Sequence, residues 1–272
     1  MKTLVLANHK GGVGKSAVAT LLAHYFAHNG QRVLCIDFDH QGNFGNPLIR
    51  SGRVEVAAFT SDRLMTESGQ VVAAPASAHP LALVPASVLL SGLDRQPTLH
   101  NTYATRLQAF LRAHDARFDV CLIDTHPNPD IRLVAALACA DRVLSTLQLN
   151  QEALDGVHSL LNHPRAGVRP IKAHVNPKLE LMGLLPTLVE SNPFQKANFA
   201  QVVRLYRQLL IPLGPEPGNI AFIPRRAIFA EAQAEGAVLW EMKKTAARDT
   251  WKEIEAGIRQ IANTLTEAGR AS

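Results

Sequence analysis

A glycine-rich segment near the N-terminus has the residue types that bind phosphate groups. Residues 10–16 read Lys-Gly-Gly-Val-Gly-Lys-Ser and lie between an apolar run and a run with helical spacing. Glycines let backbone N–H groups point toward an anion, and the positive end of a following helix adds to the attraction. Lys15 is expected to reach the phosphates, and the Ser16 hydroxyl to bind Mg²⁺. The residues expected to surround the phosphates are Gly11, Gly12, Val13, Gly14, Lys15, Ser16 and Ala17.

The generic phosphate-loop pattern, G-x-x-x-x-G-K-[ST], does not describe this segment. Its first glycine would fall at position 9, which is His9. A deviant form with an additional lysine, K-G-G-x-G-K-[ST], fits at all seven positions. A glycine turn with two incidental lysines is the alternative, and the position between a strand and a helix argues against it.

Carboxylates follow two further apolar runs. Asp37 and Asp39 come directly after residues 32–36, and Asp124 comes directly after residues 120–123. Ligands of parallel sheets bind at the carboxyl ends of the strands, so these acids are expected to face the phosphate loop. Asp124 is expected to bind Mg²⁺, through a water because magnesium dehydrates reluctantly. Asp130 is favoured as the N-cap of the next helix.

Short apolar runs alternate with segments of helical periodicity along the chain. This pattern predicts an α/β fold with a doubly wound, mostly parallel sheet and helices on both faces. The expected strands are residues 3–7, 32–36, 81–84, 120–123, 142–146, 179–185 and 220–223. The expected helices are about 18–26, 102–114, 152–161 and 246–265. Residues 45–80 give no clear prediction. Without repeats or low-complexity tracts, 1–272 is expected to be a single domain.

The phosphate loop resembles that of the ParA/MinD P-loop ATPases. Residues 37–43, D-F-D-H-Q-G-N, resemble the family's D-x-D-P-Q-G-N segment with His40 in place of proline. Residues 124–127, D-T-H-P, resemble its D-x-P-P segment with His126 in place of proline. Many relatives have a second hydroxyl residue where this chain has Ala17, whose side chain cannot hold the α-phosphate.

The resemblance continues through weaker motifs along nearly the whole chain. These are L-A-L-V-P-A at 81–86, A-L-D-G at 153–156, N-P-K-L-E-L-M-G at 176–183, and I-P-R at 223–225 followed by A-E-A at 230–232. Their order and spacing, more than any one of them, support the assignment. The I-P-R segment of relatives lies beside the adenine, which makes Pro224 and Arg225 candidates for base contacts, with a plain surface loop as the alternative.

The resemblance implies an ATP hydrolase with ATP and Mg²⁺ as cofactors and with weak intrinsic activity. It implies that Lys10 crosses an ATP-dependent homodimer interface to the partner's phosphates. It assigns the orientation of the attacking water to Asp39 and support of the metal region to Asp37; a pair of solvated turn aspartates is the alternative. The catalytic set implied is therefore Lys10, Lys15 and Asp39, and the metal set Ser16, Asp37 and Asp124.

The resemblance further implies DNA partition, that is, plasmid or chromosome segregation. No helix-turn-helix extension is expected before the first strand, so this is the short ParA type that binds DNA without reading its sequence. A ParB-like centromere-binding protein would stimulate hydrolysis. The formal charge of +5 permits contact with a polyanion. The basic residues expected to touch DNA are Lys196, Arg204, Arg207, Arg226, Lys243, Lys244 and Arg248, the last three on one helical face. For any one of them a solvated charge is the alternative.

Other functions would require a membrane-binding tail, a membrane span or paired cysteines. A MinD-like regulator needs an amphipathic, bulky C-terminal tail, and residues 267–272 are small and polar. No apolar run approaches the roughly 20 residues of a membrane span, so a cytoplasmic, nucleoid-associated protein is expected. A protein cargo carried on DNA stays open. Cys35, Cys121 and Cys139 lack the context of an iron–sulfur reductase, and two of them are expected to be buried. An inactive binding module is disfavoured by the complete set of charged residues.

Overall fold

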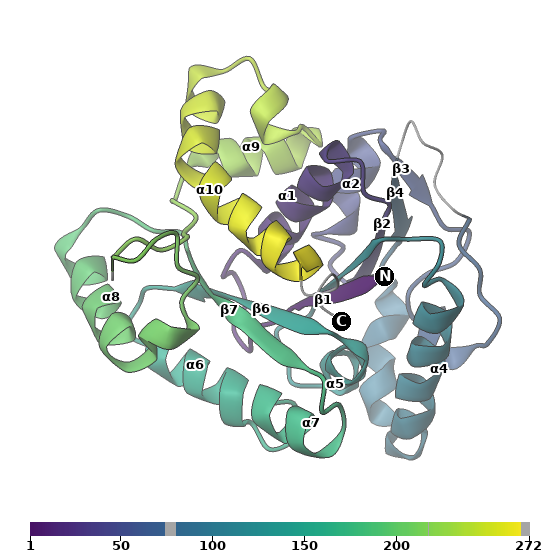
Figure 1. Ribbon diagram of the computed structural model, residues 1–272. Coiled ribbons are helices and arrows are strands. Elements are labelled where there is room, and N and C mark those ends of the chain that lie inside the picture. The colour runs from purple at the N-terminus through teal and green to yellow at the C-terminus, as the bar shows by residue number, and fades with distance from the viewer. Residues whose placement is uncertain (74–79, 217, 268–272) are drawn as a thin grey trace.

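A single seven-stranded sheet organises the part of the chain that the structure describes, residues 1–73, 80–216 and 218–267 of a computed structural model (Figure 1). All neighbouring strands pair in parallel, in the order β3-β4-β2-β5-β1-β6-β7. The strands are β1 (Lys2–Leu6), β2 (Val33–Phe38), β3 (Val54–Val56), β4 (Leu81–Val84), β5 (Val120–Thr125), β6 (Arg142–Gln148) and β7 (Glu180–Thr187).

Helices cover both faces of the sheet (Figure 1). They are α1 (Lys15–His28), α2 (Gly45–Arg50), α3 (Arg63–Thr66), α4 (His100–Ala113), α5 (Ile131–Cys139), α6 (Ala153–Asn162), α7 (Val168–His174), α8 (Pro193–Tyr206), α9 (Ala227–Glu235) and α10 (Thr245–Glu267). Short 3₁₀ turns are η1 (Val88–Arg95), η2 (Pro97–Leu99), η3 (Arg207–Leu209) and η4 (Leu239–Glu241).

The alternation of side chains along each strand explains the two cores. Leu4 and Leu6 of β1 pack with α1, α9 and α10 on one face, whereas Val5 packs with α4 to α7 on the other. A strand that is buried on both faces must be apolar at every position, which is why the strands read as continuous apolar runs. The predicted doubly wound α/β fold is confirmed.

The predicted strand at residues 220–223 is wrong. This segment makes one isolated bridge, Ile220 with Pro212, and a second bridge, Pro224 with Val189, follows directly after it. Its N–H groups change partner along the segment, from Ala221 to the carbonyl oxygen of Ile211 and from Ile223 to that of Pro186, so no ladder continues along one strand. Ile220 and Ile223 are nevertheless buried, and burial by itself accounts for the apolar run.

Residues 45–80 show no clear periodicity in the sequence. Residues 45–80 contain α2, β3 and α3, each six residues or shorter, and elements of that length leave little periodicity to detect.

Residues 268–272, on which the expectation of no membrane-binding tail largely rests, lie outside the described residues. No described helix is long and apolar enough to cross a membrane. Cys35 and Cys121 are buried as expected.

His24 of α1 makes folding stability depend on pH. Its side chain is buried with Nε2 lacking a hydrogen-bond partner, and burial, followed by the charge of Arg53, lowers its pKa to about 4. The unfolded chain, whose histidines have a pKa near 6.5, therefore binds the proton first as the pH falls. This contribution to stability is complete above about pH 6.5 and is lost as the pH falls toward 4.

We expect His24→Leu to flatten that dependence. Between pH 7 and pH 5 the wild type should lose about 2 kcal/mol of unfolding free energy more than the variant does. Urea denaturation curves at the two pH values measure the difference. Equal losses in both proteins would show that His24 is not the group responsible.

Candidate active site

The phosphate loop joins the end of β1 to the start of α1. Gly12 and Gly14 have φ angles of 72° and 78°, which residues with a side chain rarely adopt. Gly14 is the N-cap of α1, and no side chain caps this helix end. The first N–H groups of α1 are therefore left for an outside acceptor. A loop of this shape at a helix N-terminus binds an anion such as a phosphate.

Lys15 lies inside this loop rather than in solvent. Its side chain is largely buried, and Nζ donates a hydrogen bond of 3.2 Å to the carbonyl oxygen of Lys10. Burial lowers the pKa of Lys15, while the carboxylates of Asp124 and Asp39 oppose that shift. A phosphate group in the loop would stabilise the Lys15 ammonium group in place of the water that burial has removed.

Ser16 and Asp124 meet where β5 ends. The Ser16 hydroxyl donates to Asp124 Oδ2 at 2.6 Å, and Asp124 is fully buried. Its other oxygen, Oδ1, is buried without a hydrogen-bond partner. Burial raises the pKa of Asp124 to about 7. A hydroxyl and a carboxylate with one unsatisfied buried oxygen are donors that fit Mg²⁺.

Asp37 and Asp39 occupy different environments although they are two residues apart. Asp37 is fully buried and accepts hydrogen bonds from the N–H groups of Asp39 (3.0 Å) and Gly45 (2.8 Å). Burial, then the charge of Asp124, raises its pKa to about 8. Asp39 accepts only a bond from the Gln41 N–H at 3.0 Å. Asp37 thus shapes the turn, and Asp39 presents the more accessible carboxylate.

Lys10 points to another element of its own chain. Its ammonium group forms an ion pair with Glu152, directly before α6, and Glu152 is mostly exposed. Exposed ion pairs contribute little stability, roughly 0–1 kcal/mol. This contact therefore leaves Lys10 free to change partner.

A hollow of about 370 Å³ continues from the phosphate loop. It extends from Gly14 and Ala17 to Pro224 and Arg225, so the structure brings the two base-side candidates to the loop. Arg225 also lies 3.6 Å from Glu190. The remaining lining residues are Val18, Leu21, Thr187, Leu188, Ile223, Arg226, Ala227, Phe229 and Ala230.

Three of these residues were missed by sequence reasoning. Thr187 Oγ1 donates to the carbonyl oxygen of Val13 at 2.8 Å and so fixes the phosphate loop to the end of β7. Leu188 is the only described non-glycine residue with positive φ, 54°. The nearest signal for the first two was the weak motif at 176–183, which ends four residues before Thr187; no pattern indicated Phe229.

The segment after Asp124 leads into α5. Asp130 accepts from the N–H of Arg132 at 3.0 Å and is the N-cap of α5, as predicted. It also forms an ion pair with the Arg132 guanidinium, which donates to the carbonyl oxygen of Phe38 at 3.4 Å. This contact connects the start of α5 with the end of β2.

Comparisons with known proteins agree with this geometry. A family model described as "AAA domain" matches residues 1–181. Protein IncC of Escherichia coli is 34% identical over 269 residues, covering 94% of this chain and 68% of IncC. The chromosome partitioning protein ParA of Caulobacter vibrioides is 32% identical over 250 residues, covering 89% of this chain and 88% of ParA.

Solved structures match over most of the chain. Apo McdA of Cyanothece superposes with a TM-score of 0.74 at 23% identity, covering 97% of this chain and 99% of McdA, which supports the fold. A cobyrinic acid a,c-diamide synthase of Mycobacterium smegmatis, solved with an ATP analogue and magnesium, gives 0.67 at 25% identity, covering 86% of this chain and 93% of the synthase.

An all-parallel sheet with a glycine loop before α1, and with acids at neighbouring strand ends, defines the P-loop nucleotide hydrolase class. Within this class, the deviant loop with its additional Lys10 and the extent of the sequence matches indicate one family. The chain belongs to the ParA/MinD type of P-loop ATPases.

Proposed function

We propose that this chain, acting as one domain over 1–272, is a DNA-partition ATPase that switches with its nucleotide. It hydrolyses ATP with Mg²⁺ as cofactor, and in its ATP-bound state it dimerises and binds DNA without sequence preference. The observation that carries the proposal is the complete deviant phosphate loop, in which the half-buried Lys10 is held only by an ion pair with the exposed Glu152. Relatives named as partitioning proteins along most of the chain support it.

The phosphates of ATP are held by the N–H groups of residues 11–17 and by Lys15. Mg²⁺, when bound, neutralises charge on the phosphates. Ser16 and Asp124 hold it, and Asp37 keeps the turn beside them in place. Asp39 orients the attacking water, since its carboxylate is at a strand end and is not consumed by several N–H donors. Pro224 and Arg225 line the space for the base.

Lys10 supplies the link between nucleotide and dimer. On ATP binding it leaves Glu152 and reaches the phosphates of a second copy, where it stabilises the charge that develops during hydrolysis. Because the site is complete only with the lysine of a partner, turnover depends on dimerisation. A ParB-like DNA-binding partner would then stimulate hydrolysis and return the protein to monomers.

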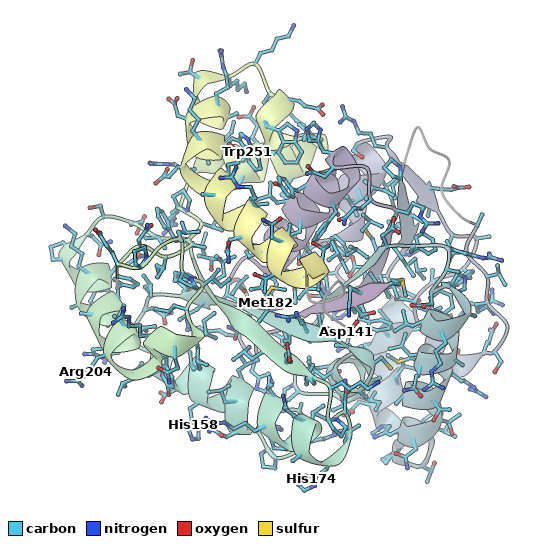
Figure 2. The ribbon with its side chains drawn as sticks, in the orientation of Figure 1. Asp141, His158, His174, Met182, Arg204 and Trp251 are labelled. Carbon is cyan, nitrogen blue, oxygen red and sulfur yellow. The ribbon has the colours of Figure 1, made fainter. Side chains whose placement is uncertain are left out.

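The basic candidates for DNA contact form two groups. Lys196 and Arg204 lie on α8, with Arg207 directly after it, and all three are exposed. Figure 2 shows Arg204 on the outer side of that helix. No described carboxylate forms an ion pair with these three residues. This group is our first choice for DNA contact, and binding through it would bring the protein to the nucleoid in the cytoplasm.

The second group differs from the sequence expectation. Lys243 and Lys244 precede α10, which begins at Thr245, so they cannot share a helical face with Arg248. The Arg248 guanidinium instead donates to the carbonyl oxygen of Lys243 at 3.0 Å. Lys244 forms an ion pair with Glu231, and Arg226 one of 3.4 Å with Glu253. These pairs reduce the charge offered to DNA.

DNA binding with ATP, ADP or no nucleotide tests the proposal. We expect binding to unrelated duplexes only with ATP, and loss of that binding in Lys10→Ala. The double variant Arg204→Glu, Arg207→Glu should weaken binding at least about tenfold and reduce the slope of log K against log salt by about 2, because two phosphate contacts are removed. Fluorescence anisotropy at several salt concentrations measures both quantities.

The matched control is Arg169→Glu, Lys172→Glu, which reverses two exposed charges on α7. It should bind DNA like the wild type. Equal weakening by both double variants would mean that net charge, and not α8, governs binding. Absence of DNA binding in every nucleotide state would reject the proposed DNA-partition function. It would favour a membrane or a protein as the surface on which the ATPase acts.

A further inference from the structure

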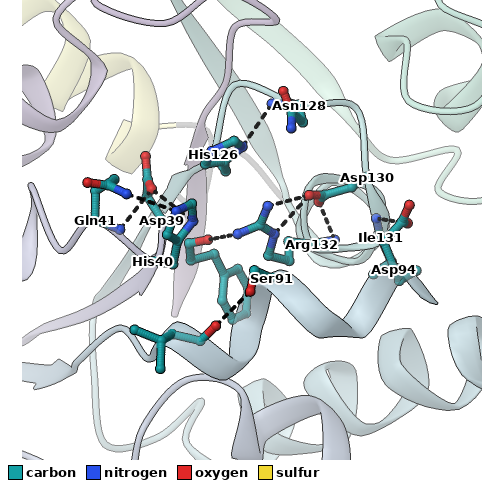
Figure 3. Close-up of polar contacts among 12 residues, drawn as sticks. Asp39, His40, Gln41, Ser91, Asp94, His126, Asn128, Asp130, Ile131 and Arg132 are labelled. Carbon is teal, nitrogen blue, oxygen red and sulfur yellow. Dashed lines mark hydrogen bonds and ion pairs between the residues drawn. The ribbon is translucent and has the colours of Figure 1, made fainter. Parts of the chain in front are cut away.

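Two histidines and Asp39 meet just beyond the carboxyl ends of β2 and β5 (Figure 3). The strands pair in parallel, with Asp37 beside Asp124 and the following residues, Phe38 and Thr125, also paired. The same register brings the segment 39–40 next to His126. The rings of His40 and His126 stack, with centroids 5.1 Å apart and planes at 30°.

We propose that Asp39, His40 and His126 form a binding site for a transition-metal cation of the Zn²⁺ class. A ring nitrogen of each histidine and a carboxylate oxygen of Asp39 lie within 4.8 Å of one another. Among the described residues, no other three histidine, cysteine or acidic side chains meet in this way. Two imidazoles, one carboxylate and a water are the donor set of an open tetrahedral zinc site. Magnesium prefers oxygen ligands only, so this site differs from that at Ser16 and Asp124.

The donor atoms are available for a cation. His40 Nδ1 is buried without a hydrogen-bond partner and lies 3.7 Å from Asp39 Oδ1. The opposite nitrogen, Nε2, is 2.8 Å from the side-chain amide of Gln41, a neighbour able to orient the ring. Only a neutral imidazole binds a cation, and each of the two rings has a nitrogen directed toward the cluster.

The charges and the spacing around the cluster are compatible with a cation. Two cations act on the cluster: Arg132 on His126 and Lys15 on Asp39. The ion pair of Arg132 with Asp130 offsets the first. Ligand atoms around a tetrahedral zinc ion with bonds of about 2.0–2.1 Å are roughly 3.3 Å apart. Because the donor atoms are at most 4.8 Å apart, side-chain rotations that move them by about 1–2 Å reach that spacing. Asn128 N–H donates to His126 Nδ1 at a long 3.2 Å, which a small rotation would release.

Both histidines stand where the pattern of the family has proline, which cannot bind a metal. The cluster is therefore a property of this sequence and not of the phosphate loop. A cation there would take the carboxylate that orients the attacking water and so slow ATP turnover. This consequence, unlike the binding itself, rests on the proposed function.

Calorimetric titration of the nucleotide-free protein with Zn²⁺, in excess Mg²⁺ to saturate the oxygen site, tests the binding. We expect one equivalent to bind, and Co²⁺ in its place to give the visible spectrum of a low-coordinate site. His40→Ala and His126→Ala should each weaken binding at least about tenfold, since loss of supporting groups alone costs 10–100-fold. Asp39→Asn removes the charge of the third ligand while nearly keeping the shape of the side chain.

The control is His163→Asn, which removes an imidazole from the second histidine pair, His9 with His163, whose ring centroids are 5.3 Å apart. It should bind Zn²⁺ like the wild type. Absence of stoichiometric binding, or binding that persists when both His40 and His126 are alanine, would overturn the site. Zn²⁺ should also slow ATP turnover until EDTA equimolar with the Zn²⁺ is added, with Mg²⁺ kept in excess. Binding without that effect would leave the site standing and count against the role given to Asp39.

Discussion

Lys15→Met is expected to lower ATP turnover by about 10²–10³-fold or more, the loss typical of removing one group that stabilises transition-state charge. Methionine has nearly the same length, so the buried space stays filled while the charge disappears. The loop would then bind phosphates through its N–H groups alone. Steady-state release of inorganic phosphate measures the effect on turnover.

Loss of ligand-induced stabilisation should accompany the loss of turnover. A ligand that binds the folded state stabilises it according to its concentration and affinity. The wild type should therefore melt at a higher temperature with Mg²⁺ and a slowly hydrolysed ATP analogue, and Lys15→Met should show little of this shift. Lys178→Met, at an exposed lysine after α7, is the control and should behave like the wild type. Turnover within a few-fold of wild type in Lys15→Met would contradict the assignment of the phosphate site.

Asp39→Asn is expected to separate ATP binding from ATP hydrolysis. The amide keeps an oxygen to accept the Gln41 N–H, so the turn after β2 should persist. It is a much weaker base and orients water poorly, and such groups typically contribute about 10²–10⁴-fold to a rate. We therefore expect turnover to fall by that order while nucleotide affinity changes little. ATP-bound dimers should accumulate and DNA binding should outlast that of the wild type.

Rapid-quench assays for hydrolysis, and size-exclusion chromatography with ATP for the dimer, give the two readouts. Asp155→Asn, at an exposed aspartate of α6, is the matched control. If Asp39→Asn lost ATP binding together with turnover, Asp39 would be needed for the structure of the site and not for orienting the attacking water. If turnover were unchanged, another group would have to orient the water.

Local chemistry explains why the phosphate site was predictable from sequence. A loop that presents several N–H groups to an anion needs glycine at positions with positive φ, and Gly12 and Gly14 have that conformation. The apolar runs before Asp37 and Asp124 predict strands buried on both faces, and parallel pairing places their ends together. The glycine loop and the apolar runs depend on neighbours in the chain, so the sequence alone determined the fold class and the phosphate loop.

Contacts between distant segments were decided only by the tertiary structure. The Lys10 contact with Glu152, the fixation of the loop by Thr187, and Phe229 in the adjoining hollow join residues far apart in the chain. The different environments of Asp37 and Asp39 arise because only Asp37 meets the N–H of Gly45. In the sequence, His40 and His126 are two separate departures from the family pattern. Only the pairing of β2 with β5 brings them together beside Asp39. Periodicity and motifs report on local backbone conformation and burial, whereas the partner of a side chain is set by how the strands and helices pack.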